Sequence, residues 1–236
     1  MLFQYSPFVK GDNTVSFDLM YAIEKFPILL KYSYMTIILS VISMIISIII
    51  SIIITLLRYY RVKGVQKIIG FYIDFFRGTP LVTQLFFLYY GLAQLIPAFR
   101  NMSGFTAAII GLSLNASAYM AENMRAAIES VDYGQTEAGY SVGMKRLQIM
   151  RYIVLPQAAK VAIPTLTNDF IGLIKSSSMA FVLGVRDIMA QTALVGASSY
   201  RYFECYFDAI IIYFIITKVV SFIQKKIEKA MNKNKR

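Results

Sequence analysis

Four ionisable residues interrupt stretches of sequence that are otherwise apolar. Glu122, Arg125 and Glu129 follow one another at spacings that place them on one face of a helix. Asp169 stands beside Asn168 in a second apolar stretch. An unpaired charge in lipid costs several kcal/mol, so such residues are kept where they bind something. We expect Glu122 and Asp169 either to bind a cationic group or an ion, or to clamp neighbouring helices, while Arg125 and Glu129 can reach the headgroups.

A second polar feature lies where another apolar run begins. Gly78 and Pro80 break helical regularity beside Arg77, which either binds lipid headgroups at a helix start or has a part in gating a passage. Gln84 follows within the run, with no charge near it in the sequence, and needs a hydrogen-bond partner there.

The composition places these residues in a membrane. The chain has 236 residues, 57% of them hydrophobic and 16% charged, a balance that leaves too few charges to cover a soluble domain. Five apolar segments come close to the roughly 20 residues that a helix needs to cross a bilayer. Pro164 and the serines at 176–178 are expected to break the fourth. The predicted spans are residues 32–57, 80–99, 106–131, 158–185 and 206–223.

Basic residues give the predicted orientation. Arg58, Arg61, Lys63 and Lys67 follow the first span with no acidic residue among them, which places that end in the cytoplasm. Five spans then put the N-terminus outside and the C-terminus in the cytoplasm. The first apolar run begins too late for an ordinary secretory signal, so we expect a permanent span.

The chain divides into three predicted parts. Residues 1–31 form an extracytoplasmic or interfacial segment, in which 17–30 is either a helix lying in the interface or a disordered leader. Residues 32–224 form the transmembrane domain, with a cytoplasmic loop at about 132–156, and residues 225–236 form a basic cytoplasmic tail.

Several kinds of chemistry are excluded by what the sequence lacks. Histidine is absent and Cys205 is the only cysteine, which excludes a histidine triad, a histidine-ligated metal and an internal disulfide. No phosphate-binding G-x-x-x-x-G-K-[ST] motif and no recognisable catalytic group of side chains occurs. The surplus of Lys and Arg gathers beside the spans, so it indicates topology and not nucleic-acid binding. Energy must come from another subunit or from an ion gradient.

The loop between the third and fourth spans is unusually rich in signals for a connection of this kind. It reads QTEAGYSVGMKRLQIMRYIVLP over residues 135–156, a charged and glycine-punctuated segment suited to docking onto a protein in the water. Its marker residues are Glu137, Ala138, Gly139, Gly143, Ile153, Leu155 and Pro156.

These markers resemble the cytoplasmic signature of importer-type ABC transporter permeases, written E-A-A, then G, then I-x-L-P. The spacing agrees throughout, although Gly139 stands where alanine is usual. Residues 76–91, 118–131 and 168–185 are similar to segments of the polar amino-acid permeases, and the resemblance covers about residues 30 to 225.

The resemblance implies an all-α membrane protein with the type I importer permease fold, in the cell membrane of a bacterium. It implies a pore of two permease subunits, which are two copies of this chain or this chain and a relative. Two ATPase subunits, which bind ATP and Mg, and an extracytoplasmic solute-binding protein would complete the importer. The loop would form two short helices meeting near Gly143. Gly139 and Gly143 would stack at i, i+4, and Pro156 would stop the second helix.

The implied cargo is a polar amino acid, with cystine-type systems the nearest match. A zwitterion needs both signs of charge or dipole in a sheltered cavity. Candidates for contact with the cargo are Thr79, Gln84, Asn115, Glu122, Asp169, Ser176 and Ser177. Candidates for structural or gating roles are Arg77, Gly78, Pro80, Arg125 and Lys175, the last of which lies on the wrong side of its helix to pair with Asp169.

Three other readings remain open at this point. An ion-coupled secondary amino-acid transporter could use Glu122 and Asp169 for a coupling ion, with the broken fourth span typical of that class. It would lack an inverted repeat and any use for the docking loop. A membrane-embedded enzyme has no paired catalytic carboxylates to use here. A scaffold without a pathway would leave the intramembrane polar groups as links between helices.

Overall fold

The described chain is entirely helical. The computed structural model describes residues 17–232, and no strand occurs among them. Residues 1–16 and 233–236, which belong to the predicted N-terminal segment and basic tail, lie outside the described residues. The α-helices are α1 Leu19–Lys31, α2 Ser33–Tyr59, α3 Gln66–Gly78, α4 Leu81–Phe86, α5 Leu92–Leu95, α6 Gly104–Glu129, α7 Tyr133–Ser141, α8 Arg146–Ile149, α9 Leu155–Ser176, α10 Ile188–Ser199 and α11 Tyr202–Asn232.

Non-α turns join several of these helices. A π turn at Phe87–Gly91 links α4 to α5, and another at Met150–Val154 links α8 to α9. Short 3₁₀ segments occupy Pro97–Phe99 and Ser177–Leu183. Each lies where one helix passes into the next, so the interruptions divide long helical stretches into separately oriented parts.

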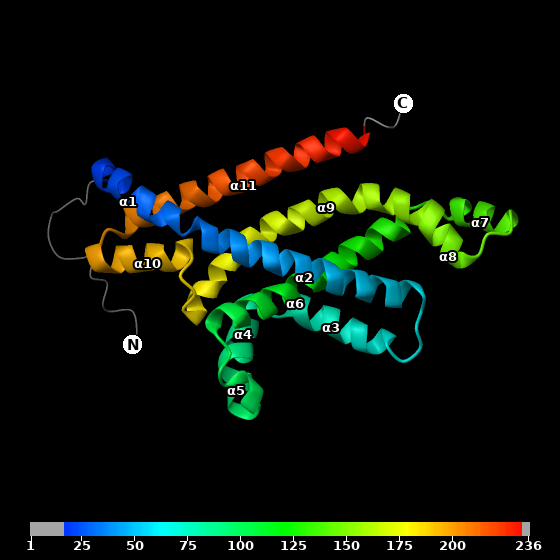
Figure 1. The fold of residues 1–236 in the computed structure, drawn as a ribbon, viewed down its shortest axis with the longest axis horizontal. Coiled ribbons are helices and arrows are strands. Elements are labelled where there is room, and N and C mark those ends of the chain that lie inside the picture. Colours follow the sequence, from blue (N-terminus) through cyan, green and yellow to red (C-terminus); the bar gives the residue numbers. More distant parts are fainter. Residues whose placement is uncertain (1–16, 233–236) are drawn as a thin grey trace.

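The long helices lie together as a bundle with two distinct ends (Figure 1). The α7–α8 hairpin lies at the same end as the connection between α2 and α3, and this is called the hairpin end below. α1 and α10 lie at the opposite end, while α4 and α5 leave the bundle at a steep angle. The residues that we expected to bind an ATPase and the basic residues after the first span therefore share one end.

A stripe of small polar residues explains how α2 packs into the bundle. Its members recur every three or four residues and are buried, several of them against α6, while isoleucines cover the exposed side of α2. Ser47 Oγ donates to the carbonyl of Ser113 at 3.1 Å, and Thr55 Oγ1 to that of Ala121 at 3.4 Å. Small residues let membrane helices approach closely, and hydroxyls bond across the gap. The stripe comprises Ser33, Thr36, Ser40, Ser43, Ser47, Ser51 and Thr55.

The helix lengths support some of the five predicted spans but not all of them. Three helices of the described chain are long and apolar enough to cross a membrane: Leu19–Tyr59, Gly104–Glu129 and Tyr202–Lys229. A fourth crossing results if Arg146–Leu183 and Ile188–Ser199, bent by 53°, count as one. The segment predicted at residues 80–99 contains only a short apolar helical stretch. Five spans and the orientation therefore stay predictions.

The helix expected near residue 17 is present as α1, and the alternative of a disordered leader is wrong for the described residues. Asp18 caps it by accepting the backbone N–H of Tyr21 at 3.0 Å. Only Tyr32 separates α1 from α2, so α1 extends the first long helix and does not form an isolated element.

Two details of the fourth span differ from prediction. Pro164 lies inside α9, which continues past it, so it does not break the span. The serines do mark an end, because α9 stops at Ser176 and a 3₁₀ segment leads to Gly184, whose φ is +77°. The short α10 that follows was not predicted, and Asp187 begins it by accepting the N–H of Ala190 at 2.8 Å.

Candidate functional site

The predicted docking loop folds into a helical hairpin. Asp132 begins α7 by accepting the N–H of Gly134 at 2.8 Å, and Gln148 accepts the N–H of Lys145 at 2.7 Å where α8 begins. The turn between the two helices contains Gly143 in the left-handed region, with φ +79°. The prediction of two short helices meeting near Gly143 is confirmed.

Gly139 is where the hairpin helices come closest. It is buried, and a Cβ atom there would lie 2.8 Å from Ile149 Cγ1 and 3.2 Å from Ile153 Cδ1. Gly139 therefore lets the side chains of Ile149 and Ile153 pack directly against the backbone of α7. The predicted stack with Gly143 is wrong, because Gly143 lies in the turn and not in α7, with open space where its Cβ would be.

Pro156 does not end a helix as we expected. It is the second residue of α9, and the chain runs helically from α8 through the π turn at Met150–Val154 into α9. A proline near the start of a helix is tolerated because that N–H lacks an intrahelical partner. The hairpin is therefore joined to α9 without a loop.

The hairpin presents exposed apolar residues among polar and charged ones. Val142 is 76% exposed and Leu147 is 66% exposed, and both lie at or near the turn. Among the predicted docking residues, the structure leaves most at the surface and turns Gly139 and Ile153 inward. The exposed ones are Glu137, Ala138, Gly143, Leu155 and Pro156. Apolar residues held outward on a rigid element are typical of a protein-binding surface.

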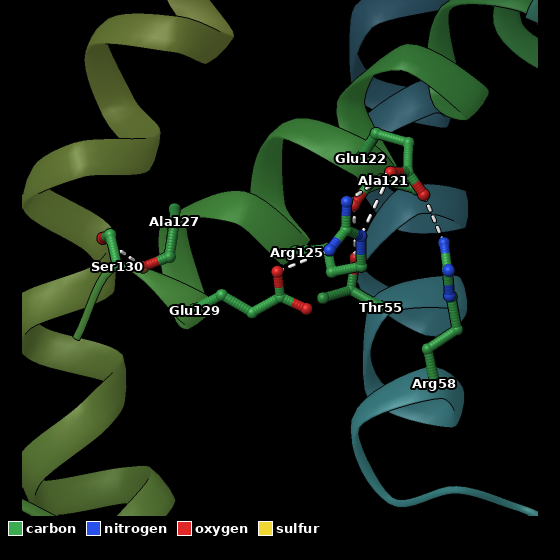
Figure 2. A network of polar contacts seen from close by, with 8 residues as sticks. All are labelled: Thr55, Arg58, Ala121, Glu122, Arg125, Ala127, Glu129 and Ser130. Atoms are coloured by element: carbon green, nitrogen blue, oxygen red, sulfur yellow. Dashed lines mark hydrogen bonds and ion pairs between the residues drawn. The ribbon is translucent and has the colours of Figure 1, made fainter. Parts of the chain in front are cut away.

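The charged residues of α6 form an interhelical network (Figure 2). Arg125 donates to Glu122 through Nε at 3.0 Å and Nη2 at 2.8 Å, and to Glu129 through Nη1 at 2.5 Å. The other oxygen of Glu122 accepts from Arg58 of α2. The predicted shared face of the α6 charges is confirmed. Sequence reasoning missed the pairing with Arg58, and it means that Glu122 has a basic partner on each oxygen.

A cavity opens beside this network at the hairpin end. Its volume is about 850 Å³, and its wall includes residues of α2, α6, α7 and α8. Its charged lining is dominated by arginines from three elements: Arg58, Arg61, Arg125 and Arg146. Glu129 and Asp132 supply negative charge, so the cavity is lined by both signs.

Asp169 has a different partner from the charges of α6. Both of its carboxylate oxygens accept from Asn123 Nδ2, at 3.0 and 2.8 Å, which joins α9 to α6. The expectation that Lys175 does not serve as its partner agrees with this arrangement. Asn123 was not predicted as this partner, although the amide directly follows Glu122 in the predicted third span.

Three predicted polar residues converge at the break between α3 and α4. Gln84 Nε2 donates to Thr79 Oγ1 at 2.7 Å and to the carbonyl of Phe76 at 3.0 Å. Asn115 Nδ2 donates to Gln84 Oε1 at 3.0 Å and to the same carbonyl at 3.0 Å. The predicted need of Gln84 for a partner is met, and the amides hold the irregular backbone against α6.

The remaining predicted residues surround this break or lie beyond α9. Gly78 ends α3, and Pro80 is extended before α4 begins. The Arg77 guanidinium lies 5.5 Å from the ring centre of Tyr119. Ser177 is buried and donates to the carbonyl of Ile174 at 2.8 Å, so its hydroxyl serves its own helix end. Tyr119 and Asn123 are four residues apart on one face of α6, and they contact Arg77 and Asp169 respectively. The spacing of residues in the sequence did not predict these two contacts.

Comparison with known proteins gives the family. Residues 47–233 match the family described as "Binding-protein-dependent transport system inner membrane component". The probable amino-acid ABC transporter permease protein PatM of Vibrio harveyi is 44% identical over 93% of this chain and 98% of its own length. The L-cystine transport system permease protein TcyB of Bacillus subtilis is 38% identical over 88% of each chain.

A solved structure agrees with these sequence matches. The crystal structure of an amino acid ABC transporter with histidines contains a chain that is 35% identical to this one, with a TM-score of 0.85. The match covers 91% of this chain and 99% of that one. The resemblance inferred from the loop and the type I importer permease fold are confirmed. The chain is a membrane-embedded transport subunit and not a catalytic one, and it belongs to the binding-protein-dependent inner membrane components, among the amino-acid ABC transporter permeases.

Proposed function

We propose that this permease subunit imports a polar amino acid into the cytoplasm, driven by ATP hydrolysis in a separate ATPase docked on residues 137–156. The observation that carries the proposal is the hairpin itself. It is folded around the buried Gly139, it exposes Val142 and Leu147, and it continues into α9 without a loop. Movement of a rigid hairpin is therefore delivered directly to a long helix of the bundle.

The full importer would contain two permease subunits, two ATPase subunits and an extracytoplasmic solute-binding protein. The second permease would be another copy of this chain or a relative. ATP and Mg would be bound by the ATPase, since this chain has no phosphate-binding motif. The basic residues after α2 and on the hairpin favour a cytoplasmic hairpin end.

Asp169 is the carboxylate that we propose for the ammonium group of the cargo. Its partner Asn123 is neutral, so its negative charge stays uncompensated by the contacts that hold it. Glu122 is already neutralised by Arg58 and Arg125, which favours a clamping role for that carboxylate. Arg77 and the polar break at Thr79, Gln84 and Asn115 beside it are the proposed contacts for the carboxylate group.

Cystine is a reasonable first cargo to test because one relative is named as an L-cystine permease. The permease, the ATPase and the receptor would be reconstituted in liposomes, and uptake of labelled cystine, arginine and glutamine measured. Uptake should require ATP on the hairpin side and survive collapse of ion gradients. Asp169→Asn should lower uptake by about tenfold, the effect of removing one charged partner of a buried ligand.

One result would contradict this function. Uptake that persists without ATP while a proton or sodium gradient is maintained would favour the ion-coupled alternative. Unchanged uptake by the Asp169→Asn variant would leave the function in place but would remove Asp169 as the contact for the cargo.

A further inference from the structure

Arg146 forms an unusual contact between the hairpin and the end of α2. It is the first residue of α8, and its Nη2 donates to the backbone carbonyl of Tyr59 at 2.5 Å. Its guanidinium also lies 4.8 Å from the ring centre of Tyr59 and 5.2 Å from that of Tyr60. The two rings meet edge to face, with centroids 5.1 Å apart. One side chain therefore contacts two rings and a carbonyl of another helix.

The partner carbonyl makes this contact effective. Tyr59 is the last residue of α2, and the last carbonyls of a helix have no intrahelical donor. A cation there also interacts favourably with the negative end of the helix dipole. The Tyr59 side chain packs against the buried hairpin residues Ile149, Met150 and Val154, so the contact is backed by apolar packing.

Further polar interactions join this end of α2 to α6. Arg58, the neighbour of Tyr59, pairs with Glu122 of α6, and Glu122 pairs with Arg125. One turn earlier in α2, Thr55 donates to the carbonyl of Ala121. Polar links thus run without interruption from the hairpin through the end of α2 into α6.

We propose that Arg146 is a positioning residue that fastens the docking hairpin to α2, so that displacement of the hairpin moves α2 and, through Arg58 and Glu122, α6. This inference rests on the proposed function, in which the hairpin receives the motion of an ATPase. It gives the hairpin a second connection to the bundle beside its covalent continuation into α9. Lysine could reach the carbonyl but could not cover both rings with a planar group.

Coupling efficiency in the complete transporter tests the role of Arg146. The number of amino-acid molecules imported per ATP hydrolysed would be measured for Arg146→Gln and for Arg61→Gln. Arg61 is a matched control, because it lines the same cavity and its side chain makes no ion pair with the described residues. Arg146→Gln should lower the ratio by about tenfold, as expected for loss of a hydrogen bond from a charged group. Arg61→Gln should leave the ratio unchanged.

A second measurement reports on the contact without transport. Spin labels at Val62→Cys and Val142→Cys, both exposed positions, would measure the distance between the end of α2 and the hairpin in the purified permease with Cys205→Ser. Arg146→Gln should broaden the distance distribution, and Arg146→Lys should broaden it less. An unchanged distribution in Arg146→Gln, or an unchanged import ratio, would overturn the proposal. Uptake that needs no ATP in the unaltered protein would instead refute the proposed function, while the distance measurement would still decide the contact.

Discussion

Both ends of the bundle place a carboxylate in polar contacts between elements, but they use it differently. At the hairpin end, Glu122 lies between Arg58 of α2 and Arg125 of α6, so one negative charge joins two long helices side by side. At the opposite end, Glu204 near the start of α11 is 1% exposed and holds the start of another helix. One arrangement links helices along their sides, and the other fixes where helices begin.

The contacts at the opposite end combine backbone N–H groups with side-chain ion pairs. Glu204 Oε1 accepts the N–H of Asp18 at 3.1 Å and lies 3.6 Å from Arg201 Nη1, which pairs with Asp18 at 2.8 Å. Asp187 begins α10 by capping it. Asp187 stabilises the start of its own helix, whereas Glu204 and Arg201 hold the start of α1 against the start of α11. The comparison teaches that both ends join helices through charged groups, but only the charges of the hairpin end lie where the docking hairpin meets the bundle.

Replacing Glu122 should have the largest effect. Glu122→Ala leaves Arg58 and Arg125 facing each other without the carboxylate between them. We expect the free energy of unfolding to fall by about 2.5 kcal/mol, a value between those of exposed and fully buried pairs, because the partly buried Glu122 has two basic partners. Chemical unfolding of the purified permease in detergent measures this. A loss below about 1 kcal/mol would mean that the network contributes little, in line with ordinary surface pairs.

Replacing Glu204 should affect stability but not coupling. Glu204→Ala leaves the N–H of Asp18 and the Arg201 guanidinium without their buried acceptor. The free energy of unfolding should fall by about 1.5 kcal/mol, because the partly buried N–H of Asp18 loses its acceptor and Arg201 keeps only Asp18 as a partner. The import ratio per ATP should stay at the value of the unaltered protein, measured in the folded fraction. A fall in that ratio would break the distinction between the two ends.

Gly143→Ala tests the turn of the hairpin through its backbone alone. The φ of +79° is unfavourable for a residue with a Cβ, while the space around that Cβ is open. We expect a loss of about 1 kcal/mol. Gly172→Ala is the matched control, since its Cβ also meets open space but it lies inside α9. That change should be neutral or stabilising. Equal losses in both variants would remove the turn as the cause.

Glu129→Gln should have the smallest effect. Glu129 pairs with Arg125 on α6, but its side chain is 62% exposed. Exposed pairs four residues apart on one helix contribute below about 0.5 kcal/mol, so unfolding should hardly change. If the free energy of unfolding fell as much as in Glu122→Ala, the whole network would act as one unit. The pair between Glu122 and Arg58 of α2 would then contribute no more than the pair between Arg125 and Glu129.

Local sequence patterns predicted the elements better than the contacts between them. The spacing of Glu122, Arg125 and Glu129 was enough to place three charges on one helix face. The link from Glu122 to Arg58 spans 64 residues of sequence, and no local rule brings those residues together. Gln84 and Asn115 were likewise singled out separately, and only the folded chain joins them.

Glycine and proline were harder to interpret because each has several uses. Gly139 and Gly143 share the spacing of a helical stack, but one packs within a helix and the other has the positive φ of a turn. Pro156 and Pro164 suggested helix ends, yet both lie within α9. α10 was not predicted because it is short and because its small and apolar residues do not recur with a clear helical period.

The π turn at Met150–Val154 has a consequence for comparing relatives of this chain. A π turn accommodates one residue more than an α-helical turn, and each residue of an α-helix rotates the chain by about 100°. Because the π turn takes up that extra residue, a relative with one residue fewer at this point could form an ordinary α-helical turn and keep the hairpin and α9 in nearly the same relative rotation. A single-residue gap in an alignment here therefore need not change which faces of the two segments are presented to the rest of the molecule.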